Sequence, residues 1–147
     1  KTIHGRIEGP IANIDMRLEH RMQSMCLESI EQGIINSAHD LSDGGLAVNI
    51  AESIMASKED LGASLNLVRK LEDVELLFGE CPSVIIVTIG ESDLYNLVVL
   101  AKKYDIHTQT IGKVTDDGVL NINSQISLTK KEMSDSYFNA IEEMIKS

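Results

Sequence analysis

Residues 37–46, which read Ser-Ala-His-Asp-Leu-Ser-Asp-Gly-Gly-Leu, constrain the fold of this chain more than any other segment. A short apolar stretch with strand character precedes them at 34–38, and an amphipathic stretch follows at 46–55. The glycine pair favours a sharp turn, because glycine adopts backbone conformations that other residues avoid. The segment therefore predicts the end of a strand, a tight turn and the start of a helix, with polar side chains gathered at the junction.

The composition is that of a globular domain with an aliphatic core. The 147 residues suffice for one domain, hydrophobic residues make up 43%, aromatic residues only 3%, and tryptophan is absent. Cys26 and Cys81 lie far apart without Cys-x-x-Cys spacing, which favours packing roles and a reduced, cytoplasmic compartment over metal binding. No stretch approaches the ~20 apolar residues of a membrane span. The chain begins with Lys1 rather than Met, so we expect a fragment of a longer protein.

The charge balance excludes two classes of partner. Twenty-three acidic and 13 basic residues give a formal net charge of -10. Such a domain repels nucleic acid and anionic membranes, because neutralising their phosphates requires clustered Lys and Arg side chains. We therefore expect neither nucleic acid nor membrane as a partner. Phosphorylated small molecules stay possible, since a local site can oppose the net charge.

The hydrophobic periodicity predicts alternating helices and strands. The expected helices are 15–32, with Asp15 as cap, 44–57, 73–78, 92–104 and 129–146. The expected strands are 34–38, 63–67 as an edge or half-buried strand, 83–89 as a buried central strand, and 107–114 with 119–122 as a hairpin around Asp116-Asp117-Gly118. These elements predict an α+β fold, a mixed, partly antiparallel sheet covered by helices. Residues 1–12 are expected to form a linker and residues 13–147 the domain.

The turn between the predicted strand and helix has two chemical interpretations. A helix that begins near Gly44 offers free N–H groups and a positive dipole end to an anion, but Asp43 at the cap position would repel a bare phosphate. In one interpretation Asp40 and Asp43 bind Mg²⁺, which in turn meets phosphate oxygens. In the other, Asp43 caps the helix and the glycines serve only the backbone geometry. The residue types leave both open.

Two further polar residues have alternative roles. His39 is either a general acid or base, or a ligand-binding group, or a strand-end histidine satisfied by a backbone carbonyl. Glu80, just before the strand at 83–89, is expected to cap backbone N–H groups or to pair with a basic residue. No residue is assigned a catalytic role. The candidate ligand-binding residues are His39, Asp40, Ser42, Asp43, Gly44 and Gly45, with Asp40 and Asp43 as the candidate metal ligands.

Residues 37–47, followed by Ala51-Glu52, resemble the final domain of the phosphoribosylformylglycinamidine synthase family, which is related to aminoimidazole ribonucleotide synthetase. The segments Leu-Phe-Gly-Glu at 77–80 and Ile-Gly-Lys-Val at 111–114 fall where that family has similar segments. Family members often carry serine in place of Gly79, so a role of that hydroxyl is not expected here. The resemblance covers residues from about 15 to 147.

The resemblance implies a domain of an ATP-dependent ligase of purine biosynthesis. Such an enzyme converts formylglycinamide ribonucleotide, ATP and ammonia or glutamine into formylglycinamidine ribonucleotide, with ATP and Mg²⁺ as cofactors. Its implied partners are N-type ATP-binding domains of the same polypeptide and a glutaminase subunit, which the end of the chain at Ser147 suggests is separate. Since ATP lies mainly on N-type domains, the isolated chain is expected to be inactive. The alternative is a structural or interaction domain of another ATP-using relative, such as selenophosphate synthetase or aminoimidazole ribonucleotide synthetase.

Overall fold

The computed structural model describes residues 13–68, 73–123 and 125–146, so the predicted linker at 1–12 lies outside the described residues. Its helices are α1 (Met16–Glu31), α2 (Gly45–Ala56), α3 (Asp73–Phe78), α4 (Leu94–Tyr104) and α5 (Lys130–Lys146), with a short 3-10 helix η1 (Glu91–Asp93) before α4. Its strands are β1 (Ile35–Asp40), β2 (Gly62–Leu65), β3 (Ile85–Ile89), β4 (Gly112–Thr115), β5 (Val119–Ile122) and β6 (Ile126–Thr129). The predicted α+β class is confirmed.

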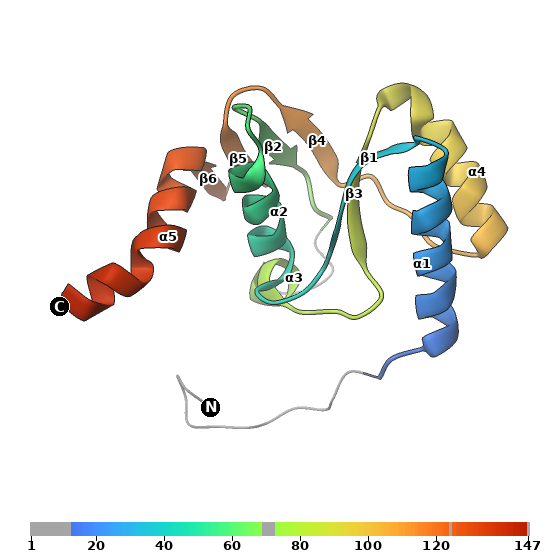
Figure 1. The fold of residues 1–147 in the computed structure, drawn as a ribbon, viewed down its shortest axis with the longest axis horizontal. Coiled ribbons are helices and arrows are strands. Elements are labelled where there is room, and N and C mark those ends of the chain that lie inside the picture. Colours follow the sequence, from blue (N-terminus) through green and yellow to red (C-terminus); the bar gives the residue numbers. More distant parts are fainter. Residues whose placement is uncertain (1–12, 69–72, 124, 147) are drawn as a thin grey trace.

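The strands of the described part form two sheets (Figure 1). β1 and β3 pair antiparallel in a two-stranded sheet. The other sheet has the order β4-β2-β5-β6, in which β2 runs parallel to β5 and antiparallel to β4, and β5 runs antiparallel to β6. This second sheet is mixed and partly antiparallel, as predicted.

The predicted hairpin is wrong, because β2 lies between the two strands that were expected to pair. Gly62, at the start of β2, lies directly against the turn at residues 116–118. A Cβ atom there would lie 2.4 Å from the Val119 carbonyl oxygen and 2.5 Å from Oδ1 of Asp117. Asp117 holds this turn through hydrogen bonds from the Thr115 hydroxyl at 2.7 Å and the Val119 N–H at 3.1 Å. The absence of a side chain at Gly62 therefore lets a third strand enter.

Two other strand predictions also need correction, and one strand was missed. The stretch 63–67 was expected to be an edge or half-buried strand, but β2 is flanked on both sides and its Ala63 and Leu65 are each only 7% exposed. The strand expected at 107–114 is shorter, since β4 begins at Gly112. β6 was not predicted at all. Strands of four residues carry too few alternating positions for their pattern to reveal either their ends or their neighbours.

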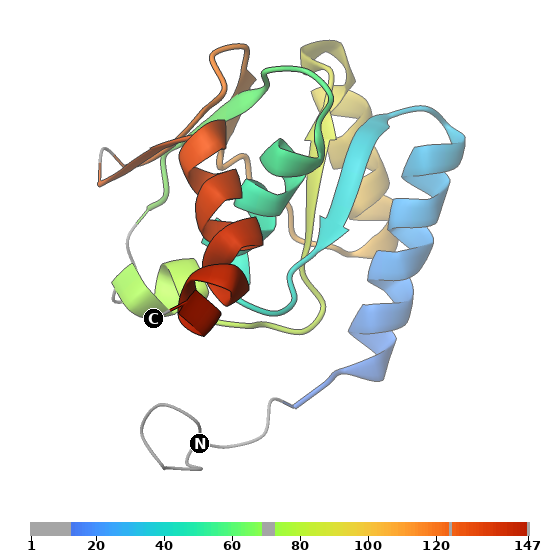
Figure 2. The same cartoon turned by 60° about the vertical axis from the view of Figure 1, so that its left-hand side comes forward.

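The strand expected at the buried centre of the sheet, β3, is half-buried along its whole length and pairs, within the described residues, with β1 alone. It nevertheless lies between α2 on one side and α1 and α4 on the other (Figures 1 and 2), and these helices carry two separate apolar clusters. Ile86 packs against the cluster built mainly on α2, β2 and β5, whereas Val87 and Ile89 pack against the cluster of α1 and α4. The β1–β3 pair therefore connects the two cores.

Candidate functional site

The strand-to-helix junction is formed by β1, a short turn and α2. His39 and Asp40 still belong to β1, where they pair with Ile86 and Ile85 of β3. The chain then turns, and the Gly45 N–H donates to the Ser42 carbonyl at 3.1 Å. The predicted order of strand, tight turn and helix is thus confirmed, and the six candidate residues lie along this junction.

The cap of α2 differs from one of the two sequence interpretations. The N-cap residue is Gly44, in a left-handed conformation with φ 85°, and no side chain of the cap residue bonds to the helix. The Asp43 side chain is exposed and makes no hydrogen bond or ion pair within the described part of the chain. Capping by Asp43 was therefore a wrong prediction.

Glu80 takes the place that Asp43 was expected to occupy. Its Oε1 accepts a hydrogen bond from the Gly44 N–H at 3.3 Å, so the predicted capping of backbone N–H groups by Glu80 is confirmed. A carboxylate at this point is stabilised by the positive end of the α2 dipole. It also adds negative charge where a phosphate would have to approach.

The glycine pair is required by the packing of the chain itself. Gly45 has φ +71°, and a Cβ there would lie 2.7 Å from the Phe78 Cα, because the end of α3 rests directly on the start of α2. A Cβ on Gly44 would meet the Val48 side chain at 2.9 Å. At Gly79, a Cβ would lie 2.4 Å from the Glu75 carbonyl oxygen, which explains why this chain has no side chain there.

The His39 ring is held by residues of α2. Nδ2 of Asn49 lies 2.6 Å from Nδ1 of His39 and also donates to the Asp40 carbonyl oxygen. Nε2 of His39 lies 3.6 Å from a carboxylate oxygen of Glu52. The other oxygen of Glu52 accepts a hydrogen bond from the Tyr137 hydroxyl of α5 at 3.1 Å, which raises the pKa of that tyrosine. Asn49 therefore holds one side of the His39 ring and Glu52 lies beside the other, and the His39 side chain is 34% exposed.

The sequence analysis missed Asn49 and Tyr137. Asn49 is 2% exposed and lies on the apolar face of α2 between Ala47 and Ile50. A polar amide in such a stripe is a signal in itself, because burying it costs free energy unless it is hydrogen-bonded. Tyr137 lies on a helix 85 residues further along the chain than Glu52, and no local pattern predicts that contact.

The remaining polar side chains at the turn face outward. The Asp40 side chain is 79% exposed, and Ser42 and Asp43 are exposed as well. Among the residues that the structure describes, no group of three or more His, Cys, Asp or Glu side chains is arranged to hold a metal ion. A cation at Asp40 and Asp43 would therefore need further ligands from a bound molecule or another part of the protein.

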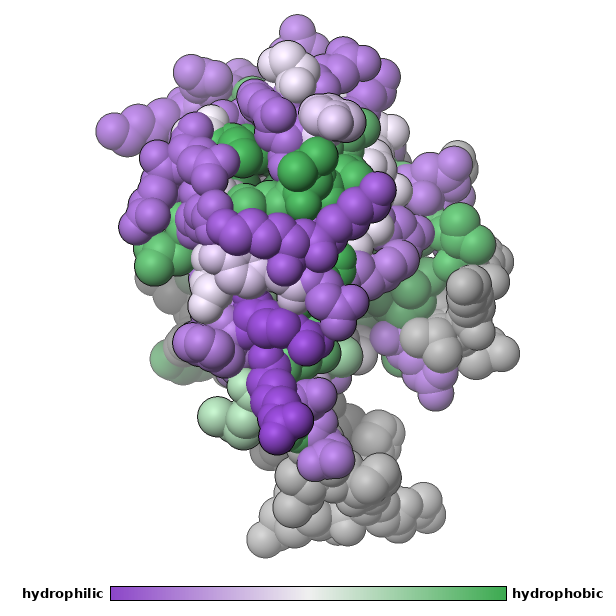
Figure 3. Space-filling model, turned by 90° about the vertical axis from the view of Figure 1, so that its right-hand side faces the viewer, coloured by the Kyte–Doolittle hydropathy of each residue, from purple (hydrophilic) through white to green (hydrophobic). Residues whose placement is uncertain are grey.

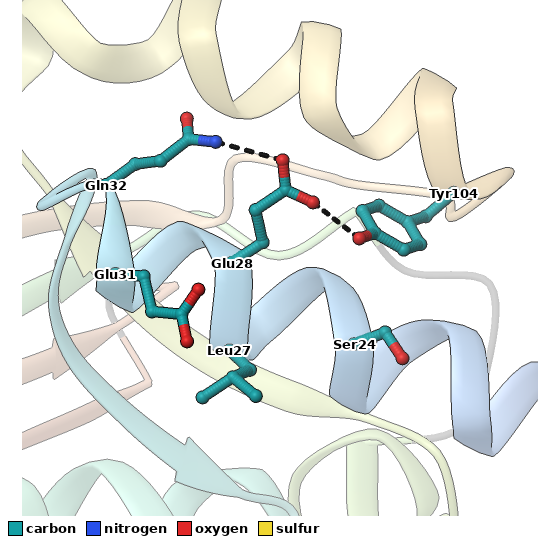
Figure 4. A pocket seen from close by; sticks show the side chains of 6 residues that line it. All are labelled: Ser24, Leu27, Glu28, Glu31, Gln32 and Tyr104. Carbon is teal, nitrogen blue, oxygen red and sulfur yellow. Dashed lines mark hydrogen bonds between the residues drawn. The ribbon is translucent and has the colours of Figure 1, made fainter.

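A second polar cluster lies between α1 and α4, away from the turn. A hollow there is lined by Ser24, Leu27, Glu28, Glu31, Gln32 and Tyr104 (Figure 4), and none of the candidate site residues borders it. Glu28 accepts hydrogen bonds from Lys103 at 2.6 and 2.7 Å and from the Tyr104 hydroxyl. These contacts lower the pKa of Glu28 and raise the pKa of Lys103 and of Tyr104.

Hydrophilic side chains dominate the face seen in Figure 3, with some apolar ones gathered among them.

Within the described ranges, no helix is both long enough and apolar enough to cross a membrane.

Comparison with known proteins identifies the family. The profile of the family described as AIR synthase related protein, C-terminal domain, matches residues 9–124. The phosphoribosylformylglycinamidine synthase subunit PurL of a Thermoanaerobacter species is 36% identical over 115 residues, and that of a Nostoc species is 36% identical over 153 residues. These alignments cover 78% and 95% of this chain, but the chain spans only 15% and 19% of those relatives.

Solved structures agree on the fold. The chain aligns with Thermotoga maritima PurL complexed with FGAR at a TM-score of 0.76 and 20% identity, over 90% of this chain and 23% of that one. It aligns with T. maritima PurL complexed with ATP at a TM-score of 0.75 and 21% identity, over 86% of this chain and 23% of that one. The profile match, which covers most of the chain, and this shared fold lead to one conclusion: the chain belongs to the AIR synthase-related C-terminal domain family.

Proposed function

We propose that this chain is the C-terminal-type domain of an ATP-dependent ligase of purine biosynthesis that converts formylglycinamide ribonucleotide into formylglycinamidine ribonucleotide. The observation that carries the proposal is that PurL relatives align with nearly the whole chain, over 95% and 97% of its length at 36% and 32% identity. Because the chain is only about a fifth of the length of those relatives, the proposed activity belongs to the longer protein.

In this proposal the turn at 39–45 is one half of a site whose other half lies on N-type domains. The exposed side chains of Asp40, Ser42 and Asp43 support it, because they make no hydrogen bond within the described part of the chain. One Asp40 carboxylate oxygen lies 3.9 Å from Nδ1 of His39. A buried turn with satisfied carboxylates would argue against a shared site. ATP binds mainly to the N-type domains, and a glutaminase subunit supplies ammonia.

Mg²⁺ fits the donor set of this turn if a bound phosphate supplies further oxygen ligands. Asp40 and Asp43 offer hard carboxylate oxygens, and Mg²⁺ commonly takes one or two carboxylates together with substrate phosphates. When bound, the ion would offset phosphate charge. The Glu80 carboxylate on the Gly44 N–H disfavours a bare phosphate at the α2 N-terminus, so a phosphate that approaches this turn does so with a cation.

The proposed reaction proceeds in two balanced steps. ATP transfers its γ-phosphoryl group to the glycinamide carbonyl oxygen of formylglycinamide ribonucleotide, which releases ADP. Ammonia then attacks the activated carbon, and inorganic phosphate leaves with the former amide oxygen, giving the amidine. We propose that this chemistry requires the N-type domains, so that the isolated 147-residue chain is inactive. The cytoplasm is the proposed location.

The test compares the isolated chain with the full-length protein that contains it. With ATP, formylglycinamide ribonucleotide and ammonia, the full-length protein should release one ADP per amidine formed, and the isolated chain should form none. Amidine formation by the isolated chain overturns its proposed inactivity. Activity of the full-length protein with selenide, or with formylglycinamidine ribonucleotide as substrate rather than product, would instead identify a different ATP-using relative.

A further inference from the structure

Asn49 determines which ring nitrogen of His39 carries the hydrogen. An amide NH₂ group has two hydrogens and no free lone pair, so its contact of 2.6 Å with Nδ1 requires Nδ1 to be an acceptor. A neutral imidazole with a bare Nδ1 carries its hydrogen on Nε2. Nε2 is the nitrogen that lies 3.6 Å from the Glu52 carboxylate, which attracts that hydrogen.

Two further contacts of Nδ1 could assign the hydrogen differently, and the first is with an Asp40 carboxylate oxygen at 3.9 Å. Nδ1 of His39 also lies 2.9 Å from the Asp40 carbonyl oxygen, a distance that a hydrogen on Nδ1 would suit. The same carbonyl already accepts from Nδ2 of Asn49. A hydrogen on Nδ1 would collide with the Asn49 amide hydrogens, whereas a bare Nδ1 and the carbonyl oxygen can share the two amide hydrogens.

Exchanging the oxygen and nitrogen of the Asn49 amide by rotation would allow a hydrogen on Nδ1, but this orientation is disfavoured. It would place Oδ1 against the Asp40 carbonyl oxygen, a closer approach of two acceptors than the 2.9 Å between a bare Nδ1 and that carbonyl oxygen in the observed orientation. In the observed orientation Oδ1 is buried without a hydrogen-bond partner within the described structure. The amide therefore leaves one acceptor unsatisfied while its donor end serves both His39 and Asp40, which is the arrangement expected if orienting the ring is its role.

The last helix contributes to the same network. The Tyr137 hydroxyl of α5 donates to the Glu52 oxygen that does not face His39, at 3.1 Å. This hydrogen bond restricts the rotation of the carboxylate, so its other oxygen stays beside Nε2. α5 lies beyond residue 124, where the family match ends, yet it reaches the candidate site through one carboxylate.

From this geometry we infer that Asn49, Glu52 and Tyr137 are positioning residues that hold His39 as an Nε2–H donor at the edge of the candidate site. The inference rests on the proposed function for its catalytic consequence, but the state of the ring can be measured without any activity. The 3.6 Å between Nε2 and the Glu52 oxygen is too long for a hydrogen bond, so the Nε2 hydrogen of this 34% exposed side chain can still be donated to an oxygen of a bound ligand.

The direct test is nuclear magnetic resonance of the nitrogen-15-labelled 147-residue chain at about pH 8, where an ordinary imidazole is neutral. Correlations between ring nitrogens and ring hydrogens should show the His39 hydrogen on Nε2. A hydrogen on Nδ1 overturns the proposal, and this measurement needs no variant. The exposed residues His20 and His107 give internal reference signals in the same spectrum.

Variants then separate the three positioning residues. In Asn49→Asp the amide donor becomes a carboxylate that only accepts, so the hydrogen should move to Nδ1; a folded variant that keeps it on Nε2 overturns the role of Asn49. Glu52→Gln and Tyr137→Phe should keep the hydrogen on Nε2 but shift its resonance, and an unchanged resonance overturns the role of that residue. Tyr95→Phe, a change at a 76% exposed tyrosine of α4, is the matched control.

The catalytic consequence is measured in the full-length protein. Asn49→Asp should lower kcat at least about tenfold while KM for ATP changes little, because a hydrogen on the wrong ring nitrogen of His39 affects the reaction more than it affects nucleotide binding. Wild-type kcat in Asn49→Asp overturns the positioning proposal. Asp43→Asn, assayed in parallel, reports separately on the proposed function. If Asp43→Asn is inactive while Asn49→Asp is active, the proposed function is supported and only the positioning inference is overturned.

Discussion

At the scale of single residues, Gly45 and Gly33 share a left-handed backbone conformation but not an environment. Their φ angles are +71° and +69°, yet a Cβ on Gly45 would meet the Phe78 backbone and a Cβ on Gly33 would meet nothing within 4 Å. Gly33→Ala should therefore cost only the backbone strain, about 1–2 kcal/mol. Gly45→Ala should cost about 1–3 kcal/mol more, because the new methyl group overpacks the contact between α2 and α3. Urea denaturation of both variants measures the difference, and equal losses would contradict the close approach.

The capping carboxylate of α2 gives a second prediction at this scale. Glu80→Gln keeps a hydrogen-bond acceptor for the Gly44 N–H but removes the charge that favours the helix dipole. The free energy of unfolding should fall by less than about 1 kcal/mol, since the site is exposed and screened by solvent. Thermal unfolding at low and high salt measures this loss, which should shrink at high salt. Glu75→Gln, at an exposed position of α3, is the control and should change nothing.

The candidate site shows how far single residues can be predicted from the sequence. Asp15 was correctly predicted as the cap of α1, since its Oδ1 accepts from the N–H groups of Arg17 and Leu18 at 2.9 and 3.2 Å. The same rule failed at Asp43, because the second glycine shifts the helix start and the carboxylate of Glu80, 36 residues beyond Gly44, takes the position. Local chemistry decides a cap only when no distant segment competes for it.

At the scale of elements, α1 and α4 are joined by Glu28 with Lys103 and Tyr104. The hydrogen bond with Lys103 is the largest cause that lowers the pKa of Glu28. A lowered carboxyl pKa stabilises the folded state above the ordinary value of about 4.3, and this stabilisation is lost as the pH falls through the depressed pKa. The pKa of Lys103 is raised, so its share of the stabilisation is present below about 10.4 and is lost as the pH rises through the raised value.

Glu28→Gln should therefore lower Tm between about pH 5 and 9, and its Tm should approach the wild-type value in acid. Scanning calorimetry across this range is the measurement. Glu31→Gln is the matched control, because Glu31 lines the same hollow on the same helix and has no ion pair in the described part of the chain. A Tm difference for Glu28→Gln that persists unchanged to about pH 2 would show that charge is not its cause.

The helices were predictable and the sheet order was not. α3 matches its predicted range of 73–78, and α1, α2, α4 and α5 begin and end within a few residues of the prediction. Helical periodicity is local, so a single stretch of sequence contains it. The entry of β2 between β4 and β5 depends on Gly62, which is distant in sequence from the turn that it enters. No pattern within either segment encodes that placement.

At the scale of the whole molecule, the two cores should unfold together. Ile122 in one cluster is 1% exposed and Leu100 in the other is 6% exposed, and β3 packs against both clusters. Ile122→Ala and Leu100→Ala should each cost about 2–5 kcal/mol and lower one shared transition. Fluorescence and far-ultraviolet circular dichroism should give coincident curves. Two separated transitions in either variant would contradict coupling through the β1–β3 pair.

The most direct test of the account is amidine formation by the full-length protein with and without the Asp43 carboxylate. The account predicts that Asp43→Asn lowers the rate from ATP, ammonia and formylglycinamide ribonucleotide at least about tenfold. It also predicts an unchanged Tm, because the exposed Asp43 side chain makes no contact within the described part of the fold. A variant that forms the amidine at the wild-type rate would contradict the assignment of this turn to a shared site.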